Sequence, residues 1–340
     1  MPKVYLRKWD RVDKDALSEA IRWCGGWDRI GRGTRVLLKP NLSFPYYKPG
    51  VTTPADVLRA VTELLLDRGA LLTVCEGCAG LDAYSMQDAF QAHGLLALRD
   101  EYGIKVVDLC SAAVTRRSFG RKAAARSVPV PDILQETDAF VTMPLVKVHA
   151  MTTVSLALKN LWGLVPDKKR LLYHSALEDI LAGLVPLLPN PLVVCDARTV
   201  LDEQGPVFGT ARPGGFLAVG NDLGAFDFAL ATLMGFDPMR IGHIRAAVRA
   251  GLAPDSLAGI TLNADLLEFR PFVFRLKRTW QNYIALAGFR NRRLCVLLYD
   301  SPVGALLHRL LYAVKGNPLR EAVATKALHG TVAKTGEGWS

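Results

Sequence analysis

The sequence lacks most of the short patterns that identify common enzyme classes. It contains neither a Walker phosphate-binding pattern nor G-x-G-x-x-G, so we expect no nucleotide site of either kind. It also lacks G-x-S-x-G and H-E-x-x-H, the patterns of serine hydrolases and zinc peptidases. Any active site in this protein must therefore be built from polar side chains that are dispersed along the sequence rather than from one of these short motifs.

Long apolar runs and closely paired cysteines are also missing. No window approaches 18 uncharged apolar residues, so we predict no transmembrane helix, and residues 1–15 contain no apolar core of a secretory signal. Six cysteines in 340 residues do not suggest a disulfide framework. Cys75 and Cys78 form a Cys-x-x-Cys pair that we interpret as two thiols. We therefore expect a cytoplasmic protein.

Positive charge is abundant and unevenly placed. Most of the net charge of +10 falls in residues 265–320, which contain ten Lys or Arg against three Asp or Glu, together with eight aromatic residues. Such a basic, aromatic segment favours an anionic surface as partner. Apolar runs alternate with the arginines, which favours peripheral contact with a membrane over nucleic acid. The alternative is a solvated basic face on helices that pack onto the body.

Strand-like and helix-like segments alternate along the first 260 residues. The predicted strands are 35–41, 71–77, 104–109, 138–144, 191–197 and 214–222, and the predicted helices are 52–69, 85–94, 176–188, 225–235 and 238–251. This order predicts an α/β fold with mostly parallel sheets flanked by helices, in two α/β lobes with a crevice between them. We divide the chain into a body (1–262, with a possible sub-boundary in 111–137), a basic, helical, amphipathic C-terminal segment (263–330) and a disordered tail (331–340).

Polar residues stand near the ends of several predicted strands. In a parallel sheet those ends meet at one edge, where ligands bind. We therefore expect the following side chains to cluster: Lys39, Asn41, Glu76, Lys147, Asp196 and Asp222.

The segment 145–174 concentrates ionisable residues within an otherwise apolar run. A lysine such as Lys159 is costly to bury unless it is paired, bound to a ligand or shifted in pKa, and a histidine such as His149 can act as an acid/base or as a metal ligand. Together these groups would form a pocket suited to a carboxylate, phosphate or enolate. In the alternative reading, His149 caps a turn, Lys159 pairs with Asp196 or Glu203, and His174 is exposed.

Several ordered motifs resemble one family. These are K-P-N (39–41), T-T-P (52–54), the block 144–166 with K-x-H and L-K-N-L-x-G, a later His174, and the segments 195–213 and 227–238. Over roughly residues 30–255 they resemble the domain of unknown function 362. Many members of that family carry a ferredoxin-like cysteine cluster near the C-terminus, whereas only Cys295 stands there in this chain. We expect no iron–sulfur cluster.

A more distant resemblance is to the nickel-pincer lactate racemases. It would make Lys159 the cofactor-bearing lysine, His174 the nickel ligand and His149 an acid/base. The chain departs from that pattern, since Leu156-Ala157-Leu158 replaces Gly-Gly-Ala, Gly77-Cys78-Ala79 replaces Gly-Thr-His, and Thr53 stands in place of an arginine. We therefore expect neither two-base racemisation nor a pincer nucleotide.

The sequence leads to one principal interpretation. It is an enzyme that acts on a small anionic or lipid-linked metabolite by proton transfer, isomerisation or reduction. The assigned roles are catalytic for His149, Lys159 and Glu76, substrate-binding for Lys39, Asn41, Thr53, Lys147 and Asn160, and ligation of a possible divalent metal for His174, Asp196 and Glu203. The alternatives are a non-catalytic membrane-associated scaffold and a redox protein that uses an external electron donor. Nucleic acid is not an expected partner.

Overall fold

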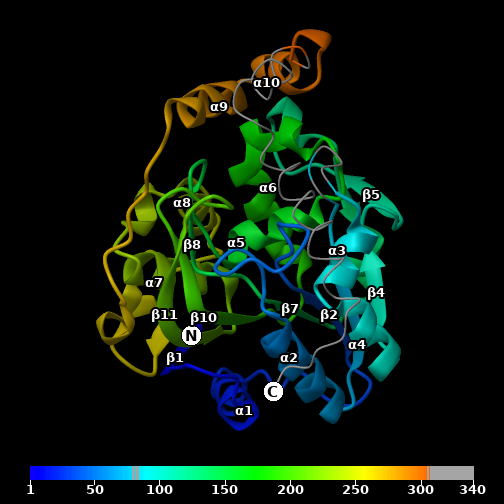
Figure 1. Cartoon of the computed structure of the whole chain (residues 1–340), viewed down its shortest axis with the longest axis vertical. Coiled ribbons are helices and arrows are strands. Elements are labelled where there is room, and N and C mark those ends of the chain that lie inside the picture. Colours follow the sequence, from blue (N-terminus) through cyan, green and yellow to red (C-terminus); the bar gives the residue numbers. More distant parts are fainter. Residues whose placement is uncertain (79, 81–83, 305, 307–340) are drawn as a thin grey trace, which may run out of the picture.

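One ten-stranded, mostly parallel sheet runs through the body of the protein (Figure 1). The computed structural model describes residues 1–78, 80, 84–304 and 306. In spatial order the main path of the sheet is β12 (Thr261–Leu262), β1 (Lys3–Lys8), β11 (Thr210–Gly220), β10 (Leu192–Asp202), β7 (Ala139–Thr142), β2 (Arg35–Lys39), β3 (Leu71–Glu76) and β4 (Lys105–Asp108). The hairpin of β8 (Lys147–His149) and β9 (Thr153–Ser155) pairs with the far end of β10. The predicted α/β class is therefore confirmed.

Helices cover both faces of this sheet. Side chains alternate along each strand, so Val36 and Leu38 of β2 join one buried cluster and Leu37 joins the other. The first cluster contains residues of α1 (Lys14–Trp23), α2 (Ala55–Asp67), α3 (Met86–Ala92) and α4 (Leu95–Tyr102), and the second contains residues of α5 (Ala157–Asn160), α6 (Leu177–Leu184), α7 (Leu223–Leu233) and α8 (Gly242–Arg249). Figure 1 shows α1 and α2 on one side of the strands and α5, α6 and α8 on the other.

The two halves of the chain thus form two helical layers on one continuous sheet, where we expected two lobes with a crevice between them. The sheet stays continuous because β7 lies between β2 and β10 and is parallel to both. The stretch 111–137 adds a small antiparallel pair, β5 (Val114–Arg117) and β6 (Val128–Pro131), to the α6 side. Val128 and Val130 are buried in the same cluster as that helical layer.

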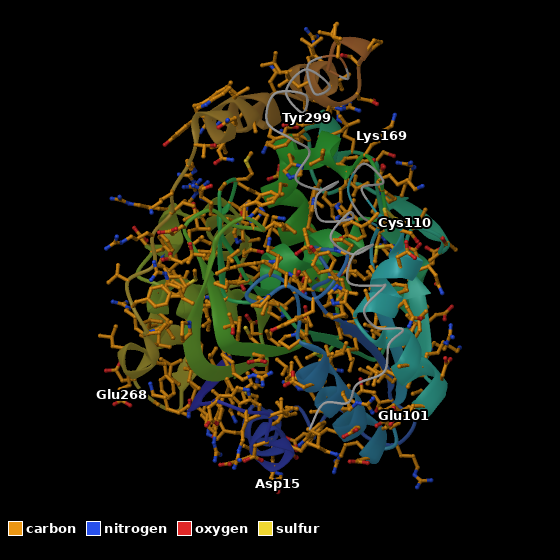
Figure 2. All side chains as sticks on the ribbon, in the orientation of Figure 1. Asp15, Glu101, Cys110, Lys169, Glu268 and Tyr299 are labelled. Atoms are coloured by element: carbon orange, nitrogen blue, oxygen red, sulfur yellow. A yellow bond between two sulfur atoms is a disulfide. The ribbon has the colours of Figure 1, made fainter. Side chains whose placement is uncertain are left out.

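The basic C-terminal segment contains two short helices, α9 (Trp280–Arg290) and α10 (Arg292–Tyr299), at one end of the molecule (Figure 1). Lys169 of the body and Tyr299 lie at this same end (Figure 2), and Lys169 Nζ forms an ion pair of 2.7 Å with Asp300 Oδ1. The residues of the predicted tail, 331–340, lie outside the described residues. Within the described chain, no helix has both the length and the apolar character needed to span a bilayer.

A buried carboxylate fixes the start of α5. The two oxygens of Asp227, on α7, accept hydrogen bonds from the backbone N–H groups of Ala157 (2.7 Å) and Leu158 (3.1 Å). Asp227 is fully buried, and α5 is a single turn that carries Lys159. The backbone position of Lys159 therefore depends on a side chain about 70 residues away in the sequence.

We predict that Asp227→Ala destabilises the protein strongly. The substitution leaves two buried N–H groups without acceptors, at about 1–3 kcal/mol each. The matched control is Asp222→Ala, which removes one ordinary cap bond to the N–H of Ala225 and should cost about 1 kcal/mol. Urea unfolding of the two variants measures the difference, and equal losses would show that Asp227 is an ordinary cap.

Candidate functional site

A pocket of about 270 Å³ opens where β2 and β3 end, beside the β8–β9 hairpin and α5. Seven of the residues predicted for the site line it: Lys39, Asn41, Glu76, Lys147, His149, Lys159 and Asn160. Of the six side chains predicted to cluster at strand ends, four line the pocket, namely Lys39, Asn41, Glu76 and Lys147, and Asp196 and Asp222 do not. The pocket also contains side chains that the sequence interpretation missed, namely Ser43, Tyr84, Ser155, Trp162 and Arg170.

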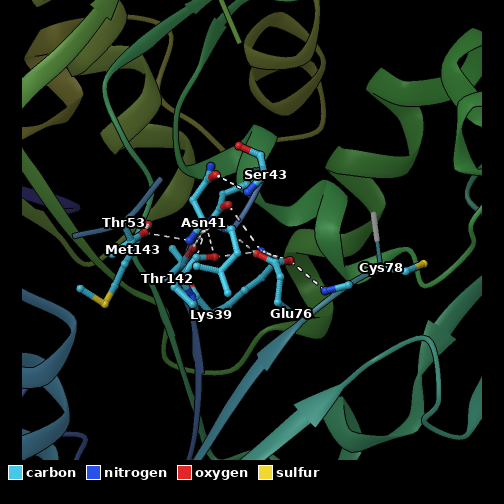
Figure 3. Close-up of polar contacts among 12 residues, drawn as sticks. Lys39, Asn41, Ser43, Thr53, Glu76, Cys78, Thr142 and Met143 are labelled. Atoms are coloured by element: carbon cyan, nitrogen blue, oxygen red, sulfur yellow. Dashed lines mark hydrogen bonds and ion pairs between the residues drawn. The ribbon is translucent and has the colours of Figure 1, made fainter. Parts of the chain in front are cut away.

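The floor of the pocket is a buried ion pair between Lys39 and Glu76 (Figure 3). Lys39 Nζ lies 2.7 Å from Oε1 and 2.8 Å from Oε2 of Glu76. The same carboxylate accepts the N–H of Gly77 (2.8 Å) and the N–H of Leu42 (3.1 Å). Four contacts thus occupy both oxygens, so the geometry makes Glu76 a structural counter-ion, whereas we had predicted a catalytic role for it.

Two glycines allow the chain to close over this ion pair. A side-chain carbon on Gly163, the last residue of the Asn-Leu-Trp-Gly turn, would overlap Glu76 Oε1 and the end of Lys39. A side-chain carbon on Gly77 would overlap the carbonyl oxygen of Gly163. Both positions therefore need glycine, which explains this part of the motif by packing rather than by chemistry.

Lys147 is buried among neutral oxygen atoms. Its Nζ donates to Val51 O (2.8 Å), Ser43 Oγ (3.1 Å) and Asn41 Oδ1 (3.3 Å). Burial lowers the pKa of Lys147 to about 7. The three acceptors around its nitrogen match the three N–H groups of an ammonium, and on this geometry we assign Lys147 as charged. Lys147 therefore contributes positive charge to the pocket while its own hydrogen bonds are already used.

Thr53 does not line the pocket, although we had predicted that it binds substrate. Its hydroxyl accepts the N–H of Asn41 (2.8 Å) and donates to Met143 O (2.8 Å; Figure 3). Asn160 lines the pocket but is similarly engaged, since its Nδ2 donates to Thr142 Oγ1 at 2.8 Å. Both residues hold the loops that present Lys39 and Asn41.

Lys159 is an ionisable group of the pocket that remains available for a ligand. Within the described part of the chain its ammonium has no hydrogen bond or ion pair, and it lies 5.7 Å from the centre of the Trp162 ring. Burial, followed by the charges of Arg170, Lys147 and Lys39, lowers its pKa to about 7. Neither Asp196 nor Glu203 pairs with it, so the structural alternative that we considered for Lys159 is wrong.

His149 is a neutral hydrogen-bond donor in this geometry. Its Nδ1 accepts the N–H of Met151 (3.1 Å), so the proton of the neutral ring is assigned to Nε2. Burial and the charge of Lys159 lower the pKa of His149 well below its usual range. Nδ1 does cap a turn, as the structural alternative proposed, and Nε2–H remains free to donate to a ligand.

Arg170 is the most informative residue that the sequence interpretation missed. Its Nη1 is buried and, in the described part of the chain, has no hydrogen-bond partner. The sequence does not single it out, because nothing in the run D-K-K-R (167–170) distinguishes it from its neighbours. Only the 3₁₀ turn that begins at Arg170 brings it to the pocket.

The three residues predicted as metal ligands lie in three different places. The ring of His174 packs against Trp162 and Phe289, with centroid distances of 5.1 and 4.5 Å. Asp196 pairs with Arg198 at 2.6 Å, and Glu203 pairs with Lys277 at 2.7 Å. Over residues 1–78, 80, 84–304 and 306, no group of three or more His, Cys, Asp or Glu side chains could hold a metal ion. Because His174, Asp196 and Glu203 lie apart, the structure corrects their assignment to one metal site.

Strand geometry explains two of the misplaced carboxylates. Asp196 lies inside β10, which continues to Asp202, and its partner Arg198 reaches α2 through Asp56. Asp222 follows β11, which runs antiparallel to β10 and therefore ends at the opposite edge of the sheet. There Asp222 caps α7 by accepting the N–H of Ala225.

The cysteines also differ from the expectation. Cys78 forms a disulfide with Cys110, while Cys75 is a buried free thiol. Cys78 lines the pocket. The partner of Cys78 is thus 32 residues away in the sequence, at a position that the Cys-x-x-Cys spacing did not indicate.

We predict that Lys159→Met stabilises the protein, and more at pH 6 than at pH 9. With a folded-state pKa near 7 and an unfolded-state pKa near 10.5, the unfolded chain binds more protons between these values. Wild-type stability therefore rises with pH across this window and carries the full cost of the charge below pH 7. The gain on substitution should differ by roughly 2–3 kcal/mol between the two pH values.

Urea unfolding at both pH values tests this, with Lys105→Met at the exposed first position of β4 as the control, for which we expect no such difference. A loss of stability in Lys159→Met that is equal at pH 6 and pH 9 would show that the ammonium is already compensated.

Known proteins resemble the chain to different extents. It is 27% identical over 234 residues to a thylakoid-associated protein of Synechocystis sp., a match over 65% of this chain and 70% of that protein. The lactate racemase apoprotein of Thermoanaerobacterium thermosaccharolyticum matches with a TM-score of 0.38 at 12% identity, over 59% of this chain and 51% of that chain. A protein of Thermotoga maritima matches with a TM-score of 0.39 at 14% identity, over 72% of this chain and 59% of that chain.

The chain therefore spans between about half and three fifths of those two structures, and neither carries an inference about activity. The family comparison is firmer. The profile described as "Domain of unknown function (DUF362)" matches residues 36–232, which include every residue that lines the pocket. This protein therefore belongs to the DUF362 family.

Proposed function

We propose that the protein is an enzyme that binds a small anionic metabolite in this pocket and moves a proton with the amine of Lys159. The observation that carries the proposal is the state of Lys159, which is buried, has no hydrogen-bond or ion-pair partner among the described residues, and has a pKa of about 7. A base with a pKa near the working pH combines a useful fraction of free base with sufficient strength. Perturbed groups in a pocket are typical of functional sites.

The proposed step is a transfer from carbon. The amine of Lys159 takes a proton from a C–H next to a carbonyl or carboxylate, and the electron pair moves onto the substrate oxygen as an enolate. His149 Nε2–H and Arg170 Nη1 are donors that could stabilise that oxygen. The ammonium then returns the proton to the same or a neighbouring carbon, so no redox partner is needed.

We predict C–H exchange that depends on Lys159. The full-length protein is incubated in D2O with a panel of small hydroxy, oxo and phosphorylated acids, and loss of the C–H signal is followed by NMR. Lys159→Met should slow exchange by about 10²-fold or more, and the wild-type rate should rise as the pH passes through about 7, where Lys159 becomes an amine.

Lys105→Met is the matched control and should exchange at the wild-type rate. Exchange that persists in Lys159→Met would contradict the assignment of the base. Anion binding to the pocket without exchange of any panel member would leave a binding protein rather than an enzyme.

We propose in addition that α9 and α10 rest on an anionic membrane surface. Among the described residues, exposed large hydrophobic side chains concentrate in this segment, including Tyr283 and Ile284 on α9 and Leu294 and Leu297 on α10. Exposed arginines accompany them on both helices. Helices that combine exposed apolar and basic side chains favour the interface of anionic lipid. The Synechocystis relative is named as a thylakoid-associated protein, and this name supports a test of membrane binding.

We predict that the double variant Tyr283→Ser/Ile284→Ser binds anionic vesicles at least about 10-fold more weakly than wild type. Each substitution removes an apolar side chain that would otherwise be buried in the lipid interface. Co-sedimentation with vesicles that contain or lack an anionic lipid measures this. The control is Leu71→Ser on β3, whose side chain is as exposed, at 61%, as that of Tyr283, at 60%. Equal binding of all three proteins would contradict the assignment of this surface.

A further inference from the structure

The pocket contains more positive charge than a ligand with a single carboxylate group would neutralise. Glu76 is the one carboxylate that lines it in the described part of the chain, and Lys39 already neutralises it. Arg170, and Lys147 when its three oxygen acceptors hold it as an ammonium, remain as cations without a carboxylate partner among the described residues, even when Lys159 is counted as a neutral amine. Buried charges without counter-ions are strongly unfavourable, so the bound state needs negative charge from the ligand.

The available donors fit an oxyanion with several oxygen atoms. Arg170 Nη1 is buried and unpartnered within the described residues, and the assigned tautomer of His149 leaves Nε2–H free. Ser155, which also lines the pocket, makes no side-chain hydrogen bond in the described part of the chain. β8, β9 and the 3₁₀ turn at residue 170 thus each contribute a polar side chain to the lining of one pocket, and sets of several donors of this kind suit a phosphate.

We propose that the anionic group of the ligand is a dianion of the phosphate-monoester type, held by Arg170 and His149 and balanced by Lys147 and Arg170. This names the substrate class of the proposed function and rests on it. A phosphate monoester is mostly doubly charged above pH 6–7, the range in which Lys159 becomes an amine. A cavity of about 270 Å³ holds such a group with a small organic remainder.

The test uses full-length protein and simple anions at pH 8 and constant ionic strength. Inorganic phosphate, methylphosphonate, malonate and acetate are titrated, and binding is measured by calorimetry and by the shift in Tm. Phosphate and methylphosphonate should bind at least about 10-fold more tightly than acetate, since each additional well-placed charge contact contributes about 1.4 kcal/mol or more. Arg170→Gln should weaken phosphate at least 10-fold, and Arg170→Lys should restore part of the affinity.

Matched controls separate the possible outcomes. Arg249→Gln, on an exposed position of α8, should bind phosphate as wild type does, and circular dichroism checks that Arg170→Gln is folded. If Arg170→Gln is unfolded, the comparison of Arg170→Lys with wild type carries the test, and unchanged phosphate affinity in Arg170→Lys overturns the proposal.

The failure of this inference is distinguishable from failure of the proposed function. Acetate binding as tightly as phosphate would overturn the dianion and leave a small-carboxylate enzyme. If malonate binds tightly and phosphate does not, the ligand is a dicarboxylate. This outcome also overturns the proposal. Absence of binding by all four anions would overturn both.

Discussion

The buried ion pair between Lys39 and Glu76 is the contact on which the rest of the site depends. It joins the ends of two neighbouring parallel strands, β2 and β3, at a distance of 2.7 Å. Its carboxylate also receives backbone N–H groups from the two loops that follow those strands. Removing either partner would leave a buried charge, which is far more costly than the pair itself. The turn at Gly163 then closes against this pair and brings α5 to the pocket.

Because Glu76 is committed to Lys39, the other cations of the pocket have no acidic partner among the described residues. Lys147 is stabilised by neutral oxygens, and Lys159 responds to burial and to its positive neighbours by a lower pKa. A protein selected for stability alone would place apolar residues at such positions. Holding Lys159 near Arg170 instead destabilises the folded protein. Such an arrangement is expected where a ligand supplies the missing negative charge.

The sequence predicts the parts of the site that depend on local pattern. The strands that end at Lys39 and Glu76 are short apolar runs followed by polar residues, and in a parallel sheet such ends must be adjacent. Asp222 could not be placed in this way, because the reversed direction of β11 has no local signature. Arg170 and His174 depend on a 3₁₀ turn whose path is set by α6, α9 and α10. The partner of Cys78 was equally hidden, since only the adjacency of β3 and β4 brings Cys110 near.

The segment 169–174 contacts the C-terminal helices and also contributes Arg170 to the pocket. A change in the helices can therefore also affect the pocket. Cys295 Sγ donates to Leu171 O at 3.3 Å, Asp300 pairs with Lys169, and Phe289 stacks on His174. Arg170 lies between these contacts, so removal of residues 265–340 would release the segment that carries it into the pocket. A truncated protein that lost both membrane binding and ligand binding would therefore not identify a scaffold. Substitutions confined to the exposed side chains of α9 and α10 leave these three contacts in place, and they alone distinguish a membrane role from a structural role of the same helices.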